Sequence, residues 1–297
     1  MTTRPYALRS AFTLIELLIA ISIIALLAAL LLPAISKVRS YANRTTATSE
    51  ITQLNSACVK FQGDWGFYPP SSFTVPTRID QPGYVLLKSK YTRWSPTLLP
   101  DNATIAPASA LANAGQTLNG NQSLVYFMQG PTRAPWQNAA IYAEYAGWAS
   151  DGPYAPSLTA TSPTSYFSFQ TSKLVGGSSL GFVSNASVYM DPFGSPYAYF
   201  GSEKIGGKYL PFSMTFNGTT TFPIRESATK FVNEKTCQII SAGETGSDGL
   251  DGSPAYSRGF GIGGIWNPGV GDYASSGNGG DDFGNFNGGA PLNRSGN

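Results

Sequence analysis

The chain has 297 residues, of which 12% are charged, and its 19 basic and 17 acidic residues form no basic cluster interleaved with aromatic residues, so we expect no nucleic-acid partner. It contains no histidine, which removes His-based nucleophilic triads, most His general bases and the usual transition-metal sites, so we expect no enzyme. The 33 glycines and 21 prolines, beside 16 tyrosines and 17 phenylalanines, favour a turn-rich domain with β-strands over a disordered tail.

The first predicted element is an apolar helix that holds a single acid. Between Phe12 and Leu32 the only charged residue is Glu16, and a helix of this length covers about 30 Å, the hydrocarbon thickness of a bilayer. A secretory signal peptide would be shorter, contain no acid and end in a small-x-small site. A plain membrane anchor would leave Glu16 as a cost of a few kcal/mol in lipid. The acid is explained if it gains a positive partner, and cutting the Ala11–Phe12 bond would create one, a free amine that a neighbouring subunit's carboxylate neutralises.

The stretch "AFTLIELLIAISIIALLAALLLP" resembles the prepilin-type cleavage and methylation signal of type IV pilins and type II secretion pseudopilins. The match runs through Ala11, where Gly is usual, then Phe12, the string "TLIE" that ends at Glu16, and Pro33. The resemblance implies that a prepilin peptidase removes the leader, residues 1–11, and N-methylates Phe12. It also implies that Glu16 sets the register of subunits in a filament whose core is the apolar helix.

The helix is expected to continue out of the membrane. Pro33 removes one backbone donor and should kink or locally open it. Beyond it, residues 34–62 carry a modestly apolar face at helical spacing, which ends near "QGDWGFYPPSS". We therefore predict a transmembrane, filament-core helix over 12–33 and an amphipathic helix over 34–62. The second helix needs a partner for its apolar face, and a small antiparallel β-sheet within residues 63–297 gives an α+β ectodomain.

Four later stretches resemble, in order, segments of type II secretion major pseudopilins: "FQGDWGFYPPS", "YMDPFGSPYAYF", "CQIISAGETGSDGLDG" and "GGDDFGNFN". Asp191, Pro192 and Gly194 in the second stretch are turn formers, and "SPYAYF" alternates as a short strand should. "TCQIIS" in the third is a short apolar strand. This order of motifs favours the pseudopilin branch of the family.

The resemblance implies a Ca²⁺ site that orders an acidic, glycine-rich loop over about residues 241–289. Hard cations take carboxylate and carbonyl oxygens, and glycine lets backbone carbonyls turn inward. Motif by motif, the expected ligands are Asp282, then Ser241 or Gly243 with Asp248, then Asp281. The alternative is that these acids are solvated turn residues beside glycines.

The middle of the chain, about residues 71–186, is longer than the family pattern and is predicted to be a large loop-rich insert. Within it, residues 124–128 fit a short apolar helix or a buried strand. The insert contains no internal repeat and no phosphate-binding or metal-ligand motif, and we expect it to decorate the outer face of a filament. Its aromatic residues can either bind cargo or sugar or fill a core, and we favour the core.

The chain has two cysteines, Cys58 and Cys237, too few for a disulfide framework. They can form one bridge in an oxidising compartment or serve as small buried hydrophobes. Nothing in the sequence places the two side by side.

The resemblance as a whole implies a single-pass inner-membrane protein with a periplasmic ectodomain. Its partners would be copies of itself and other pseudopilins in a helical pseudopilus, prepilin peptidase, the inner-membrane assembly platform and membrane lipid. A type IV pilin or minor pilin for adhesion, motility or DNA uptake is the first alternative. A membrane-anchored module that binds glycans or other ligands is the second.

Overall fold

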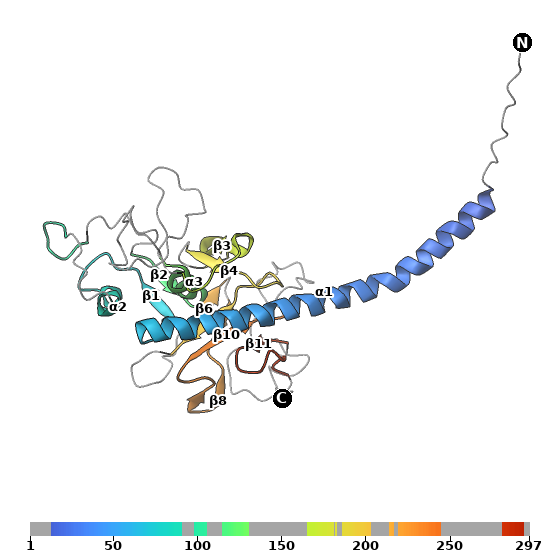
Figure 1. Cartoon of the computed structure of the whole chain (residues 1–297). Coiled ribbons are helices and arrows are strands. Elements are labelled where there is room, and N and C mark those ends of the chain that lie inside the picture. Colours follow the sequence, from blue (N-terminus) through green and yellow to red (C-terminus); the bar gives the residue numbers. More distant parts are fainter. Residues whose placement is uncertain are drawn as a thin grey trace, which may run out of the picture. The chain divides into compact units, whose positions relative to one another are not determined.

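The structure is a computed structural model that divides into two compact units, residues 1–44 and residues 45–297 (Figure 1). It describes residues 13–90, 98–105, 115–130, 165–180, 182, 186–202, 214–216, 219–244 and 281–293. Each unit is considered by itself below.

One helix, α1, runs from Leu14 to Trp65 and is assigned as helix on both sides of Pro33. Since proline lacks the N–H that would bond four residues back, the helix loses one hydrogen bond there without ending. At its carboxyl end the N–H of Gly66 donates to the carbonyl of Gln62 at 2.7 Å, and two prolines follow soon after. The predicted long N-terminal helix is confirmed, and it extends three residues beyond the expected end at 62.

The predicted small antiparallel sheet is also present. Its three strands are β5 (Ala198–Gly201), β10 (Cys237–Ser241) and β11 (Phe283–Gly284), in the order β11-β10-β5. In the antiparallel register Cys237 faces Gly201, and Ser241 faces Phe283. The apolar "TCQIIS" stretch and the closing motif therefore become neighbouring strands.

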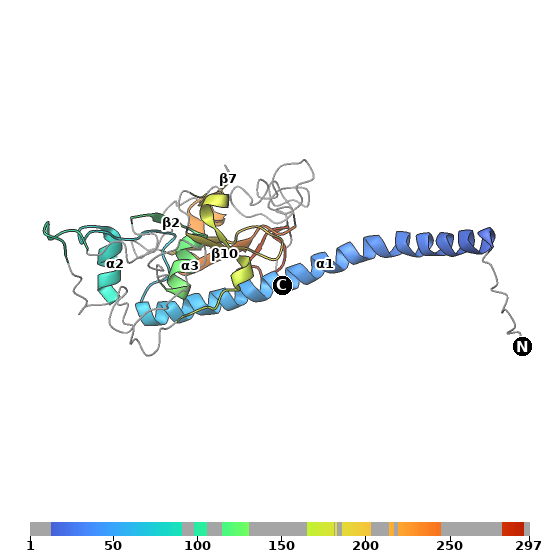
Figure 2. The same cartoon turned by 90° about the horizontal axis from the view of Figure 1, so that it is seen from above.

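Both faces of this sheet are buried, which explains why its strands are apolar without alternating. On one face Tyr199 and Ile239 pack in the same cluster as the α1 residues from Ala47 to Trp65. On the other face Phe200 and Ile240 belong to a second cluster that includes Ile224, Val232 and Leu292. The second part of α1, from Thr45 to Trp65, belongs to the same unit as the sheet, and Figures 1 and 2 show it lying along the sheet.

Short antiparallel pairs complete the unit. They are β1 (Ser72–Thr74) with β2 (Thr117–Asn119), β3 (Leu174–Gly176) with β4 (Ser187–Tyr189), β6 (Met214–Phe216) with β7 (Thr219–Thr221), and β8 (Arg225–Ser227) with β9 (Lys230–Phe231). The fully buried Gln238 ties the last pair to the sheet, because its amide bonds Ile224 twice and the carbonyl of Val232 once, each at 2.8 Å.

The described part of the predicted insert holds helices α2 (Pro82–Lys90), α3 (Asn121–Gln129), η2 (Thr171–Lys173) and η3 (Gly177–Leu180). The choice between helix and strand at residues 124–128 is settled as helix, and α3 is buried along almost its whole length. Phe73, Leu118 and Phe127 lie in the same cluster as α1, so these aromatic and apolar residues fill the main core of the unit.

Asn121 at the start of α3 binds the two segments that flank the turn at residues 191–195. Its Nδ2 donates to the carbonyls of Tyr189 and Tyr197 at 2.9 and 2.8 Å, and its Oδ1 accepts from the N–H of Tyr189 at 2.7 Å. Because the side chain is fully buried, these bonds satisfy an amide that would otherwise destabilise the fold.

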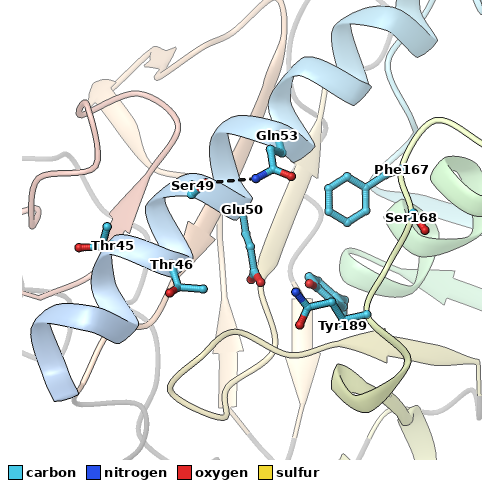
Figure 3. A pocket seen from close by; sticks show the side chains of 9 residues that line it. Thr45, Thr46, Ser49, Glu50, Gln53, Phe167, Ser168 and Tyr189 are labelled. Carbon is cyan, nitrogen blue, oxygen red and sulfur yellow. Dashed lines mark hydrogen bonds between the residues drawn. The ribbon is translucent and has the colours of Figure 1, made fainter.

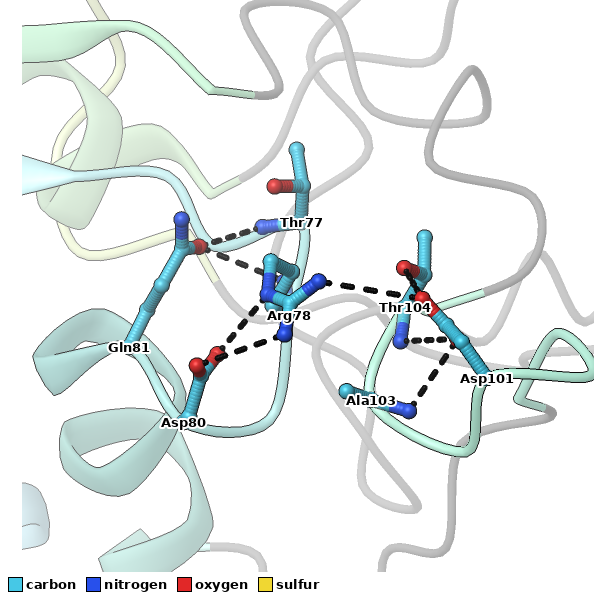
Figure 4. Close-up of polar contacts among 7 residues, drawn as sticks. All are labelled: Thr77, Arg78, Asp80, Gln81, Asp101, Ala103 and Thr104. Carbon is cyan, nitrogen blue, oxygen red and sulfur yellow. Dashed lines mark hydrogen bonds and ion pairs between the residues drawn. The ribbon is translucent and has the colours of Figure 1, made fainter.

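An exposed polar cluster joins residues 77–81 to residues 101–104 (Figure 4). The Arg78 guanidinium lies 3.1 Å from the Asp80 carboxylate and 3.7 Å from that of Asp101. Asp101 Oδ1 also accepts from the N–H groups of Ala103 and Thr104. Since these groups are exposed, the ion pairs contribute little to stability and mainly shape the surface.

Candidate functional site

The predicted assembly residue Glu16 closes the first turn of α1. Its Oε2 accepts from the backbone N–H of Thr13 at 2.9 Å and from the Thr13 hydroxyl at 2.7 Å, while the Glu16 N–H donates to that hydroxyl at 3.3 Å. This reciprocal pattern is a capping box, which satisfies donors that the start of a helix leaves open. Sequence reasoning assigned the acid to assembly alone and missed this local role, although the T-x-x-E spacing was the available signal.

The surface around Glu16 is apolar and exposed. Leu14 is 81% exposed and Leu32 is 69% exposed, and every large side chain between them is more than one-third exposed. α1 is the one helix among the described residues that is long and apolar enough to cross a membrane. Such a surface needs lipid or other apolar helices around it, because water would oppose its exposure.

The remaining predicted residues of this segment lie partly outside the described residues. Ala11 and Phe12, on either side of the predicted cleavage, fall in the residues that precede the described helix. Pro33 lies within α1.

The predicted calcium ligands that the structure describes meet at one edge of the sheet. The pairing of Ser241 with Phe283 brings the end of β10 beside Asp281 and Asp282. At Gly243 the backbone is left-handed, with φ of +64°, and a Cβ there would lie 2.6 Å from both the carbonyl and the carboxylate Oδ2 of Asp281. Only glycine fits this close approach. Asp248 lies outside the described residues.

Asp191 is a buried acid at the same edge that the sequence marked only as a turn former. Its Oδ2 accepts from the Ser241 hydroxyl at 2.6 Å, and its Oδ1 accepts from the N–H groups of Phe193 and Ser195 at 2.9 Å. Burial raises the pKa of Asp191 to about 6, and the hydrogen bonds from Ser241 and the turn oppose that rise. The turn needs Gly194, whose φ is +91°.

The donors at this edge are of the type that calcium uses, namely carboxylate oxygens from Asp281 and Asp282 with backbone carbonyls at a glycine turn. Two features limit the number of donors that a calcium ion could use here. The Ser241 hydroxyl already donates to Asp191 and accepts from the N–H of Gly243 at 3.3 Å. Within the described ranges, no three His, Cys, Asp or Glu side chains converge on a point that could hold a metal.

A polar groove of about 340 Å³ lies beside the second part of α1 (Figure 3). Its walls carry hydroxyl and amide groups and two aromatic rings, from Thr45, Thr46, Ser49, Glu50, Gln53, Phe167, Ser168, Gln170 and Tyr189. Glu50 is 6% exposed, and its carboxylate bonds the Lys173 ammonium and accepts from the Tyr197 hydroxyl at 2.7 Å. The charge of the acid is thereby paired with that of Lys173.

The fold brings the two cysteines, whose pairing the sequence left open, into the same part of the core. Cys58 in α1 and Cys237 at the start of β10 are fully buried in the same core cluster, and the sulfur of Cys237 lies 3.8 Å from Oδ1 of Asn55, three residues before Cys58. Sequence reasoning left this pairing open, since no local pattern links residues so far apart.

Comparison with known proteins identifies the N-terminal segment. Residues 7–32 match the family model of the prokaryotic N-terminal methylation motif, a range that includes Ala11, Phe12 and Glu16. No curated protein and no solved structure matches the chain. The N-terminal segment thus carries a type IV pilin-like methylation motif, and it lies on a helix that is long and apolar enough to span a bilayer.

Proposed function

We propose that this chain is a non-enzymatic structural subunit of a pseudopilus, the periplasmic filament of type II protein secretion. Prepilin peptidase cuts after Ala11 and N-methylates Phe12, and the mature protein is held in the inner membrane. At the inner-membrane assembly platform it joins copies of itself and other pseudopilins. The observation that carries this proposal is the methylation motif at the head of α1, a helix whose second part forms the core of a folded domain.

The pseudopilin branch is supported by two later segments. The "DPFG" stretch forms a turn held by Asp191 that leads into β5, and the closing "DDFG" stretch contains β11, which pairs with β10. Both segments thus shape the sheet that α1 packs on. Type IV pilins share the N-terminal motif, so this choice of branch rests on these segments and on their resemblance to pseudopilins.

Glu16 is proposed to act twice. In the single chain it caps α1, using groups of Thr13 that lie after the cleavage point and so remain in the mature protein. In the filament its carboxylate pairs with the Phe12 amine of a neighbouring subunit. A carboxylate surrounded by apolar helices is costly unless it meets a positive charge, and the new amine supplies one.

Glutamine at position 16 tests the pairing, because it retains the capping-box bonds but removes the charge. For Glu16→Gln we expect normal leader removal and an assembled-filament yield reduced at least tenfold, which corresponds to about 1.4 kcal/mol per contact. Cleavage is measured by intact mass, and filaments are measured by shearing and pelleting. Thr13→Ala, which weakens the cap and keeps the charge, is the matched control and should assemble nearly normally. Wild-type filament yield from Glu16→Gln would contradict the charge pairing.

A structural calcium ion is also part of the proposal. Asp282 and Asp281 would supply carboxylate oxygens, Ser241 and Gly243 would supply oxygens from the end of β10, and Asp248 would add a further carboxylate. The support is the meeting of the first four residues at one edge of the sheet. Bound calcium would stabilise this edge of the sheet.

A further inference from the structure

The two cysteines of the chain meet in the core of the unit formed by residues 45–297. Cys58 and Cys237 are each 0% exposed and belong to the same core cluster. Their proximity follows from one contact, since the sulfur of Cys237 lies 3.8 Å from Oδ1 of Asn55, about one helical turn before Cys58. Packing of helix α1 on strand β10 therefore brings the two thiols together.

The surroundings of the pair argue against a reactive or metal-binding role. The thiolate is the nucleophile and the metal ligand, and burial raises the pKa of the Cys58 thiol. No third His, Cys, Asp or Glu side chain among the described residues joins them in a group that could hold a metal. The chemistry left to two neighbouring buried thiols is the formation of a bond between them.

We infer that Cys58 and Cys237 form an intramolecular disulfide that joins α1 to β10. This inference rests on the proposed function for its oxidising compartment, because disulfides form and persist in the bacterial periplasm. The bond forms as the chain folds, before the thiols are buried, by exchange with an oxidant that is itself a disulfide. One cysteine attacks the oxidant and releases one thiol, and the other cysteine then attacks the mixed disulfide and releases the second thiol. The two thiols lose two protons and two electrons, and the oxidant is reduced to two thiols.

The bond would tie together parts of the chain that are otherwise held by packing and hydrogen bonds. Its nearest polar support is Asn285, whose Nδ2 donates to Asn55 at 2.8 Å and to the carbonyl of Cys237 at 3.0 Å. A disulfide here closes a loop that contains every strand from β1 to β9, and long loops lose the most freedom in the unfolded chain. A mechanical force on α1 would then be transmitted to β10, the central strand of the sheet, through a covalent bond.

In the test, the purified full-length chain is refolded from denaturant into detergent over a series of oxidised to reduced glutathione ratios, so that both thiols can react before they are buried. Samples are quenched, denatured, alkylated with N-ethylmaleimide and weighed intact. We expect no alkylation at oxidising ratios, two alkyl groups at reducing ratios, and one cross-linked peptide containing both cysteines. The oxidised form should melt about 5–15 °C higher than the reduced form. Two free thiols, glutathione adducts or a link between two chains at every ratio would overturn the inference.

Single substitutions provide the matched controls. Cys58→Ala and Cys237→Ala should each show one alkyl group and the same melting temperature at oxidising and reducing ratios. Because the measurement is made on purified protein, it does not depend on filament assembly. Bond formation in a chain whose assembly ignores Glu16 would count against the proposed function alone. Free thiols in a chain that assembles normally would count against the disulfide alone.

Discussion

At the scale of single residues, α1 carries two acids in surroundings that disfavour charge, and each is satisfied differently. Glu16 lies among exposed apolar side chains and bonds the N–H and hydroxyl of Thr13. Glu50 is buried against the sheet and bonds Lys173 and Tyr197. Local capping suits an end that is to receive a partner in a filament, whereas the bonds of Glu50 fix α1 to its own domain.

Removing the charge of Glu50 should destabilise the fold. Glu50→Gln leaves the ammonium of Lys173, whose side chain is only 19% exposed, without its carboxylate. Breaking one partner of a largely buried pair costs about 2–4 kcal/mol, because the remaining charge stays desolvated. Urea unfolding of the full chain at neutral pH measures the loss as a lower midpoint.

The pair between Glu226 and Lys230 is a matched control with the same chemistry at the surface. Its side chains are 44% and 58% exposed, so Glu226→Gln should change stability by about 0.5 kcal/mol or less. If Glu50→Gln lowered the urea midpoint no more than Glu226→Gln, the pair of Glu50 and Lys173 would not be what holds α1 to its domain.

At the scale of elements, the end of β10 and the start of β11 form the edge where the proposed calcium site lies. The strands pair through Ser241 and Phe283, and Gly243 approaches Asp281 so closely that no side chain fits between them. Asp191 adds a buried carboxylate one hydrogen bond away. A short strand such as β11 gains little from two ladder pairs alone, so a cation beside it would add to its stability.

Calcium should therefore raise the melting temperature of the full chain. At a hundred times its dissociation constant a ligand adds about 2.7 kcal/mol of stability, or about 5–10 °C for a domain of this size. The midpoint is measured in chelator and in a calcium titration, with magnesium at the same concentrations for comparison.

Asp282→Asn should abolish the calcium-dependent rise. Asp80→Asn, at an exposed carboxylate that contacts Arg78, is the control and should retain it. A midpoint that does not change with calcium in the unsubstituted protein would rule out the site.

At the scale of the whole molecule, the chain has two units that call for different surroundings. Residues 13–44 carry an exposed apolar helix, whereas residues 45–297 contain two hydrophobic clusters on the two faces of a sheet. The first unit is stable only with lipid or other helices around it, and the second contains its own core. This division suits a subunit that is stored in a membrane before it is added to a filament.

Processing should shorten the chain at Ala11–Phe12. In cells that contain a prepilin peptidase, the intact mass should correspond to a chain that begins at N-methylated Phe12. Ala11→Leu should block cleavage, because the position before the cut takes a small residue in the signal that this segment resembles. If the membrane-extracted protein still began at Met1, the predicted cleavage would be wrong, and residues 12–32 would be only a membrane anchor.

Much of the fold could be predicted from the sequence because its signals are local. An apolar run with one acid predicted the first part of α1, and turn formers around Asp191 and Gly194 predicted the turn before β5. The apolar "TCQIIS" stretch predicted β10. Each of these features depends on residues that are close together along the chain, where spacing and residue type are sufficient.

The sequence by itself thus determined the processing signal, the long helix and the α+β class of this protein. Only the tertiary structure decided which residues meet across the chain: Glu50 with Lys173, Cys237 with the helical turn that contains Asn55 and Cys58, and Asn121 with the backbone of Tyr189 and Tyr197. No periodicity encodes these pairs, because each joins segments that approach only after α1 and α3 pack on the sheet. The burial that makes each contact strong is a property of the assembled core, where water no longer competes for polar groups.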